Sequence, residues 1–379
     1  KLSGNYNPSL TGASSATADN WKVFGFEMVY VPQGEFFAGD GRSSNSSNFS
    51  AGNTANALKI TSALQASGLG LASNYTSSFL YGCSSPLPAT YPIGYNGFYC
   101  MKYEILQGQM ADFYNCLTYD QQAARLKVSS NRLLSTVNQY FGENWNNLKL
   151  YNSTTGTSNT IPATITTDYA HIPRGYMNWQ DLTAYLDWSG LRPMTEFEYE
   201  KACRGTLTPI PYEYPWGSLI LNGGNNSNVI NYKTLATDTW NIYDGACRNW
   251  EDNGPIRAGF AASSKSNRSQ SGATYYGIME MAGNVWEQCV GGGSGYDYSS
   301  FTTTNGDGTL NATSGLADVV GWPTSGGVTS GTILKGGHFI SSSNYFQYQV
   351  SDRSYNGGST ENAETIRARY IGGRGVRSF

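Results

Sequence analysis

Few residues in this 379-residue chain form a pattern typical of catalysis. It contains two histidines, His171 and His338, which are too few for a three-histidine iron site. None of its cysteines lies in a CxxC pair or has the spacing of a zinc site. The sequence also lacks a GxSxG nucleophile elbow, a Walker-type phosphate loop and an HExxH metal motif. These residues therefore predict no familiar catalytic centre.

The cysteines indicate the compartment in which the protein works more than they indicate a reaction. An even number of them, scattered along a lysine-poor chain, is compatible with disulfides in an oxidising compartment; buried free thiols are the alternative. The chain begins with Lys instead of Met, which suggests a processed N-terminus, with a shortened chain as the alternative; together with the cysteines, this favours a secreted protein. The six are Cys83, Cys100, Cys116, Cys203, Cys247 and Cys289.

Acidic residues gather in one predicted helix. Glu196, Glu198 and Glu200 follow Thr195, and the Thr195–Glu198 spacing is that of a capping box. We interpret these glutamates as capping and structural salt links and not as a glycosidase pair.

Composition excludes several classes of partner. Charged residues make up 13% of the chain, the net charge is −3 and no Lys/Arg cluster occurs, which argues against nucleic-acid binding. Mean hydropathy is −0.41, and no apolar run approaches the roughly 20 residues that cross a bilayer, so no membrane insertion is expected. Hydrophobic residues, at 39%, suffice for a sizeable core.

The periodicity predicts a few helices and short strands. Residues 26–39 read as a hairpin with its turn at Gln33-Gly34. A helical stripe runs from Leu106 to Leu117, and a second helix begins at the N-cap Asn178. After residue 207, short apolar pieces alternate with Gly, Asn and Ser. The fold class that this pattern favours is α+β with long irregular connections.

The predicted organisation is an N-terminal arm followed by one domain. Residues 1–20 lack periodicity and read as an arm or tether. Residues 21–379 form a single domain, with polar insertions near 41–85, 125–165 and 291–330.

The order of motifs resembles the formylglycine-generating enzyme (sulfatase-modifying factor) family. Segment 192–200, RPMTEFEYE, is similar to a helix motif of that family, and 277–287, GIMEMAGNVWE, is similar to its "GLYDMAGNVWEW". Further segments match in order at 28–36, 98–105, 214–217, 334–339 and 373–377. The resemblance implies the family's C-type-lectin-like fold.

The resemblance also shows where an oxidase site would lie. The family's oxidases hold copper with two cysteines just after the motif that corresponds to Gly336-Gly337-His338-Phe339. Those positions fall on Ser341 and on or beside Phe346, and no cysteine follows Cys289. A hydroxyl cannot replace a thiolate as a Cu(I) ligand. We therefore expect a non-catalytic member with no copper and no iron.

Structural calcium is the metal that the resemblance implies. On the family's pattern, Glu280 and Glu287 would supply carboxylates and Gly283 and Val285 would supply carbonyls, while Asn228 belongs to a second site. Oxygen ligands in a loop suit Ca²⁺. The alternative is that both glutamates hold hydrogen bonds inside the loop.

The C-terminal stretch is rich in Tyr, Asn and Ser, the residues typical of adaptable binding loops. We expect it to bind glycan or protein on a bacterial surface or in an extracellular assembly. A variable receptor-binding protein of a diversity-generating retroelement, a homo-oligomer or filament subunit, and a formylglycine-generating oxidase are the alternatives. The candidate ligand-binding residues are Tyr345, Tyr348, Arg353, Tyr355, Asn356 and Tyr370.

Overall fold

The computed structural model describes most of the chain outside the N-terminal arm. The described residues are 23–42, 56–66, 87–126, 148–151, 162, 164–223, 229–230, 239–240, 245–247, 254–262, 266–291, 297–327, 330–340, 345–354 and 367–379. The predicted arm and large parts of the predicted insertions at 41–85 and 125–165 lie outside them.

A four-stranded sheet joins the two ends of the described chain. Its strands are β1 (Met28–Val31), β4 (Phe98–Met101), β15 (Gly375–Arg377) and β7 (Arg192–Pro193), in that order. All three pairings are antiparallel. Val31, Phe98, Cys100 and Val376 are buried together, so the sheet packs one face against the core.

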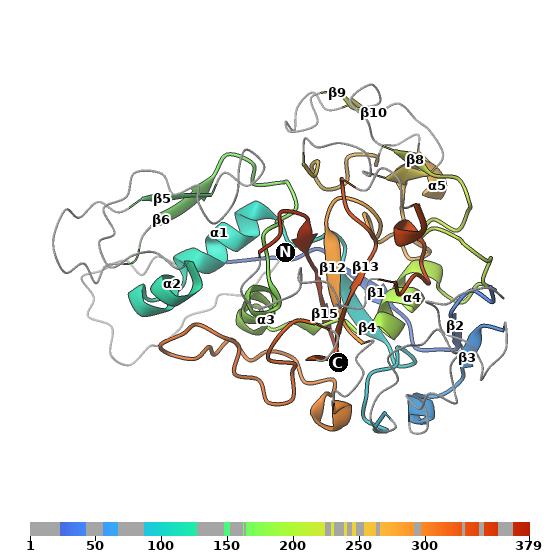
Figure 1. Cartoon of the computed structure of the whole chain (residues 1–379), viewed down its shortest axis with the longest axis horizontal. Helices are drawn as coiled ribbons and strands as arrows, with labels where there is room; N and C mark the ends of the chain where they lie inside the picture. The colour runs from blue at the N-terminus through green and yellow to red at the C-terminus, as the bar shows by residue number, and fades with distance from the viewer. Residues whose placement is uncertain are drawn as a thin grey trace, which may run out of the picture.

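A second sheet lies beside the first. It has the order β13 (Thr332–Lys335), β12 (Trp286–Val290) and β14 (Ile371–Gly372). Every residue of β12 is buried, which is expected of a strand covered on both faces. Figure 1 shows the strands of both sheets at the centre, with α1, α2 and α3 to one side and α4 to the other.

The helices begin where their capping residues predict. Asn178 caps α3 (Trp179–Trp188) and Thr195 caps α4 (Glu196–Arg204), each with a complete capping box. The predicted stripe from Leu106 becomes α1 (Gln107–Asn115), followed by α2 (Tyr119–Leu126). A short helix, α5, spans Arg268–Ser271, and 3-10 turns span Ala63–Ala66, Tyr298–Ser300 and Tyr345–Tyr348.

The predicted hairpin at 26–39 is wrong in its pairing, although both strands exist. β1 pairs with β4, and β2 (Phe36–Ala38) pairs with β3 (Leu58–Ile60). The backbone N–H of Gly34 donates to the carbonyl of Tyr95, so the turn region is anchored to a distant segment. The remaining pairs are β5 (Leu148–Tyr151) with β6 (Thr164–Thr167), β8 (Asn222–Gly223) with β11 (Ala246–Cys247), and β9 (Val229–Ile230) with β10 (Thr239–Trp240).

The described part of the predicted insertion near 291–330 contributes to the core. Tyr298, Phe301 and Trp322 pack in the same hydrophobic cluster as Trp179 and Phe197. Among the described residues, no helix is both long enough and apolar enough to cross a membrane.

Candidate functional site

The loop that leads into β12 has an unusual backbone. Glu280 and Asn284 have φ angles of 51° and 52°, a left-handed conformation that non-glycine residues seldom adopt. The Asn284 side chain holds the turn, because its Oδ1 accepts from the backbone N–H of Ile256 at 3.0 Å and its Nδ2 donates to Glu104 at 3.2 Å. Strain of this kind persists where the surroundings fix it and often marks a functional site.

Three buried carboxylates surround this loop. Glu287 forms a two-pronged ion pair with Arg374. Glu104 accepts from the N–H of Val285 at 3.1 Å, and burial, reinforced by the charge of Glu287, raises the Glu104 pKa well above its usual value. Glu280 Oε1 accepts from the N–H of Gly259 at 2.9 Å, while its Oε2 has no hydrogen-bond partner among the described residues. Burial raises the Glu280 pKa to about 7.

These carboxylates do not converge on one point. Within the described chain, only Asp187, Asp307 and Asp318 form a trio of ligand atoms within 4.8 Å of one another, and they lie elsewhere. Gly283 donates its N–H to Gly336. Asn228, assigned to the second predicted calcium site, lies outside the described residues. The calcium site stays a prediction, and the most direct competitor for its Glu287 ligand is Arg374.

The positions that correspond to the copper cysteines are only partly described. Ser341 lies outside the described residues, and Phe346 is 42% exposed. Of the six cysteines, Cys100, Cys203 and Cys289 are free thiols in this structure, so the disulfides predicted as one option do not involve these three. Cys83 and the side chain of Cys247 lie outside the described part of the structure.

Three of these thiols are poorly suited to chemistry. Cys100, Cys203 and Cys289 are buried in one hydrophobic cluster. Burial raises all three pKa values, that of Cys100 to about 12. A thiol held in its protonated form is a poor nucleophile and a poor metal ligand.

The candidate ligand-binding residues of the C-terminal stretch separate into two groups. Tyr345 is 43% exposed, and Tyr370 is partly buried against His338 with ring centroids 4.4 Å apart. Tyr348 is fully buried and donates its hydroxyl to the carbonyl of His338 at 2.7 Å. Arg353 is buried in an ion pair with Glu196 at 2.5 and 2.6 Å. Tyr348 and Arg353 therefore hold the fold and present no surface to a ligand; Tyr355 and Asn356 lie outside the described residues.

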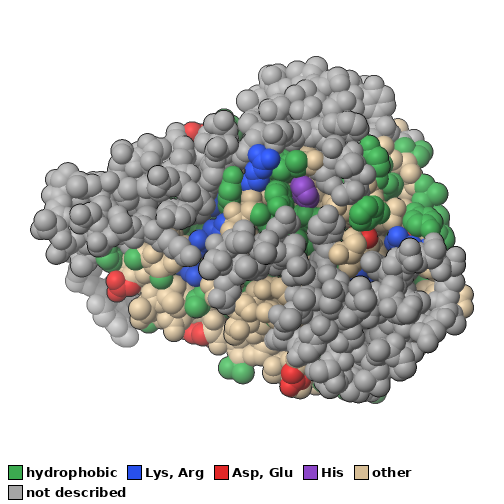
Figure 2. Space-filling view, in the orientation of Figure 1, with side chains coloured by type: hydrophobic (Ala, Val, Ile, Leu, Met, Phe, Trp, Pro, Cys, Tyr) green, Lys and Arg blue, Asp and Glu red, His purple; other side chains and the backbone are tan. Residues whose placement is uncertain are grey.

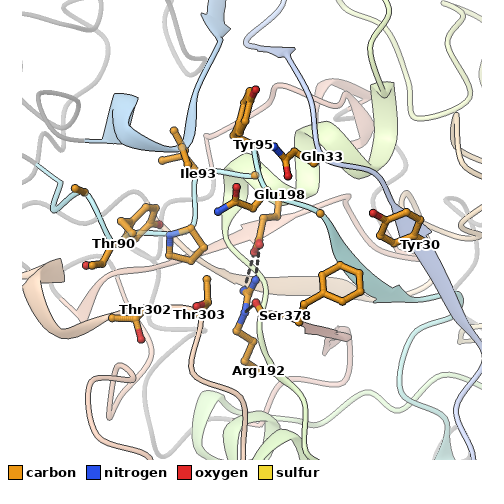
Figure 3. A pocket seen from close by; sticks show the side chains of 18 residues that line it. Tyr30, Gln33, Thr90, Ile93, Tyr95, Arg192, Glu198, Thr302, Thr303 and Ser378 are labelled. Atoms are coloured by element: carbon orange, nitrogen blue, oxygen red, sulfur yellow. Dashed lines mark hydrogen bonds and ion pairs between the residues drawn. The ribbon is translucent and has the colours of Figure 1, made fainter.

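A cavity of about 640 Å³ opens next to β1, β7 and the segment that precedes β4 (Figure 3). Its volume falls within the roughly 300–1,000 Å³ range of small-molecule sites. Most of its polar groups are neutral hydroxyls, amides and backbone groups. The lining side chains include Tyr30, Gln33, Thr90, Tyr95, Asn96, Arg192, Glu198, Thr302, Thr303 and Ser378.

Among the described residues that line this cavity, the only charged side chains are Arg192 and Glu198, which neutralise each other. Arg192 donates to both carboxylate oxygens of Glu198, at 2.8 and 2.5 Å, and to the hydroxyl of Ser378 at 2.8 Å. Figure 3 shows this pair among the other lining side chains. On the face drawn in Figure 2, the charged side chains of the described residues are likewise few and scattered. The side chains of the described lining residues therefore offer hydrogen bonds without a net charge.

Two exposed aromatic rings, those of Tyr30 and Phe379, line the cavity, and the ring of Tyr99 packs against both. Tyr30 and Tyr99 are directly opposite each other on β1 and β4, and their ring centroids lie 5.4 Å apart. Phe379 lies 5.6 Å from Tyr30 and 5.3 Å from Tyr99. Because neighbouring residues of a strand point to opposite faces, the buried Val31 and Phe98 place both tyrosines outward. The sequence motifs did not predict this site, and the available signal for it was an isolated Tyr between apolar residues of a strand.

The comparisons with known proteins identify the family. The model of the "sulfatase-modifying factor enzyme 1-like domain" matches residues 22–378. The formylglycine-generating enzyme of Thermomonospora curvata is 32% identical over 130 residues, covering 34% of this chain and 36% of that protein. The enzyme of Streptomyces coelicolor is 29% identical over 189 residues, covering 48% of each. The chain thus aligns with about half of these relatives' length or less.

A solved structure is also similar over most of the chain. The Treponema denticola variable protein 1 is 12% identical, with a TM-score of 0.41, over 93% of this chain and 95% of that one. The family match over residues 22–378, together with the mixture of short strands and few helices, confirms the predicted α+β, C-type-lectin-like fold of the formylglycine-generating-enzyme type.

Proposed function

Starting from the finding that this chain belongs to the sulfatase-modifying factor enzyme 1-like family, we propose that it binds a neutral, hydroxyl-rich ligand such as a glycan and does not catalyse oxidation. The cavity described above carries this proposal: its lining is rich in hydroxyls and amides, the charged side chains among its described lining residues form a mutually neutralised pair, and exposed aromatic rings stand at its border. Aromatic faces pack well against the C–H faces of sugar rings, while neutral donors and acceptors match hydroxyl groups.

The absence of oxidase chemistry rests on the sequence. Ser341 and Phe346 stand where the family's copper-binding cysteines are expected, and neither side chain supplies a thiolate. Loss of those ligands leaves the family's fold as a scaffold for recognition.

The proposal includes the location in which the protein acts. A polar, tyrosine-rich chain that recognises glycans fits the predicted secreted location on a bacterial surface, in contact with protein or glycan and with neither nucleic acid nor membrane. The partly exposed C-terminal tyrosines keep the variable receptor-binding protein as the second candidate, because Tyr345 lies in the stretch where such diversification is expected.

A matched pair of variants tests the location of binding. Isothermal titration with a panel of neutral mono- and oligosaccharides should identify a bound member. Tyr30→Ala should then weaken its affinity by about tenfold through loss of the stacking ring. Tyr345→Ala removes a tyrosine of similar exposure, 43% against 46%, and should leave affinity unchanged.

If Tyr345→Ala weakens the affinity and Tyr30→Ala does not, the binding site lies in the C-terminal stretch. Failure of every saccharide to bind would contradict the proposal.

A further inference from the structure

One buried guanidinium has the surroundings of a bound cation. Arg374 lies in the turn between β14 and β15 and has no exposed surface. Arginine has five N–H donors and no acceptor, so a buried guanidinium needs oxygens on several sides. Here they come from three separate parts of the chain: the end of β4, the loop before β12, and β12 itself.

The acceptors number six. Nε and Nη2 donate to the two carboxylate oxygens of Glu287 at 2.7 and 2.6 Å. Nη1 donates to the carbonyls of Met101 and Lys102, both at 3.1 Å. Nη2 also donates to the carbonyls of Met279 and Glu280 at 2.9 and 3.1 Å. Carboxylate and carbonyl oxygens in this number are what a calcium ion collects in a protein loop.

We infer that the guanidinium of Arg374 is the structural cation of this loop and takes the place of the calcium that the family pattern implies. The reason is competition for ligands: both oxygens of Glu287 already bind Arg374. The guanidinium also binds the carbonyl of Glu280, whose left-handed backbone needs outside support. Because this cation is a side chain of the protein itself, it holds the loop in place at any calcium concentration.

Calcium titration of the wild-type chain is the first test. Thermal unfolding should give the same midpoint in EGTA and in millimolar CaCl₂. The exposed Asp307→Asn variant serves as background, so that the acidic trio does not contribute a separate site. A stoichiometric calcium site in that background, abolished by Glu287→Gln, would overturn the inference.

Removal of the guanidinium is the second test. Arg374→Ala leaves six oxygens without their cation, so its melting temperature should fall by several degrees and be partly restored by CaCl₂. Arg192→Ala is the matched control: Arg192 is equally buried and pairs with Glu198, but it contacts only one carbonyl, that of Pro193. Calcium should not restore this control.

Equal responses of the two variants to calcium would contradict the inference. If Arg374→Ala does not fold, the calcium titration of the Asp307→Asn variant still decides between the two outcomes.

Discussion

Glutamates of one short helix bind arginines from three different parts of the chain. Within α4, Glu196 pairs with Arg353, Glu198 with Arg192, and Glu200 with Arg204. All six side chains are nearly or fully buried. The interpretation of these glutamates as structural salt links is confirmed. Buried pairs of this kind add little net stability compared with apolar packing, but breaking one leaves an uncompensated charge.

Arg353 gives the first prediction. Arg353→Ala should lower the free energy of unfolding by about 3–5 kcal/mol, because Glu196 would remain buried without its partner. Urea denaturation measures this loss. Saccharide affinity of the folded fraction should stay the same. A variant of wild-type stability with weakened binding would return Arg353 to the ligand-binding residues first predicted.

His338 gives a prediction of pH dependence. Burial, with a smaller contribution from the charge of Arg369, lowers its pKa from 6.5 to about 4. The folded state therefore binds fewer protons than the unfolded state between these values. Stability from this residue is present above pH 6.5 and is lost as the pH falls through 4, by roughly 3 kcal/mol in total.

The comparison with His338→Asn isolates this effect, because Glu280 and Asp352, whose pKa values are raised by burial, titrate in the opposite direction in both proteins. Between pH 7 and pH 4.5, the free energy of unfolding should fall more in the wild type than in His338→Asn. An identical change in both proteins would contradict the assignment.

At the scale of elements, local signals predicted what local contacts determine. The caps Asn178 and Thr195 could be recognised because their partners lie three residues away. The pairing of β1 with β4 could not be recognised, because the two strands lie some 70 positions apart in the sequence. Nothing in the sequence between them indicates which residues pair. The family motifs supplied the fold where periodicity alone could not.

Thr195 tests the cap directly. Its Oγ1 accepts from the N–H of Glu198 at 3.2 Å and donates to the carbonyl of Pro92 at 2.8 Å. Thr195→Ala should cost about 2–3 kcal/mol, from the lost cap and the unsatisfied buried carbonyl. Thr195→Ser keeps the hydroxyl and should lose less than half as much in the same denaturation experiment. Equal losses would mean that packing of the methyl group, and not the hydrogen bonds, is responsible.

At the scale of the whole molecule, the candidate site arises from distant segments. The cavity combines residues from β1, the stretch before β4, β7, α4, the 302–303 loop and the C-terminal end. The composition of the C-terminal stretch predicted ligand binding by residues between 345 and 370, where Tyr, Asn and Ser are dense. Two of those residues are buried instead, because composition identifies suitable side chains but does not reveal which way they face.

The central claim is that this family member binds a neutral ligand and has no copper chemistry. The chain can be mixed with a panel of neutral saccharides and one equivalent of Cu(I). Native mass spectrometry then detects bound saccharide and bound copper in the same spectrum. We predict a one-to-one saccharide complex without stoichiometric copper. A copper-bound chain that carries no saccharide would contradict the account.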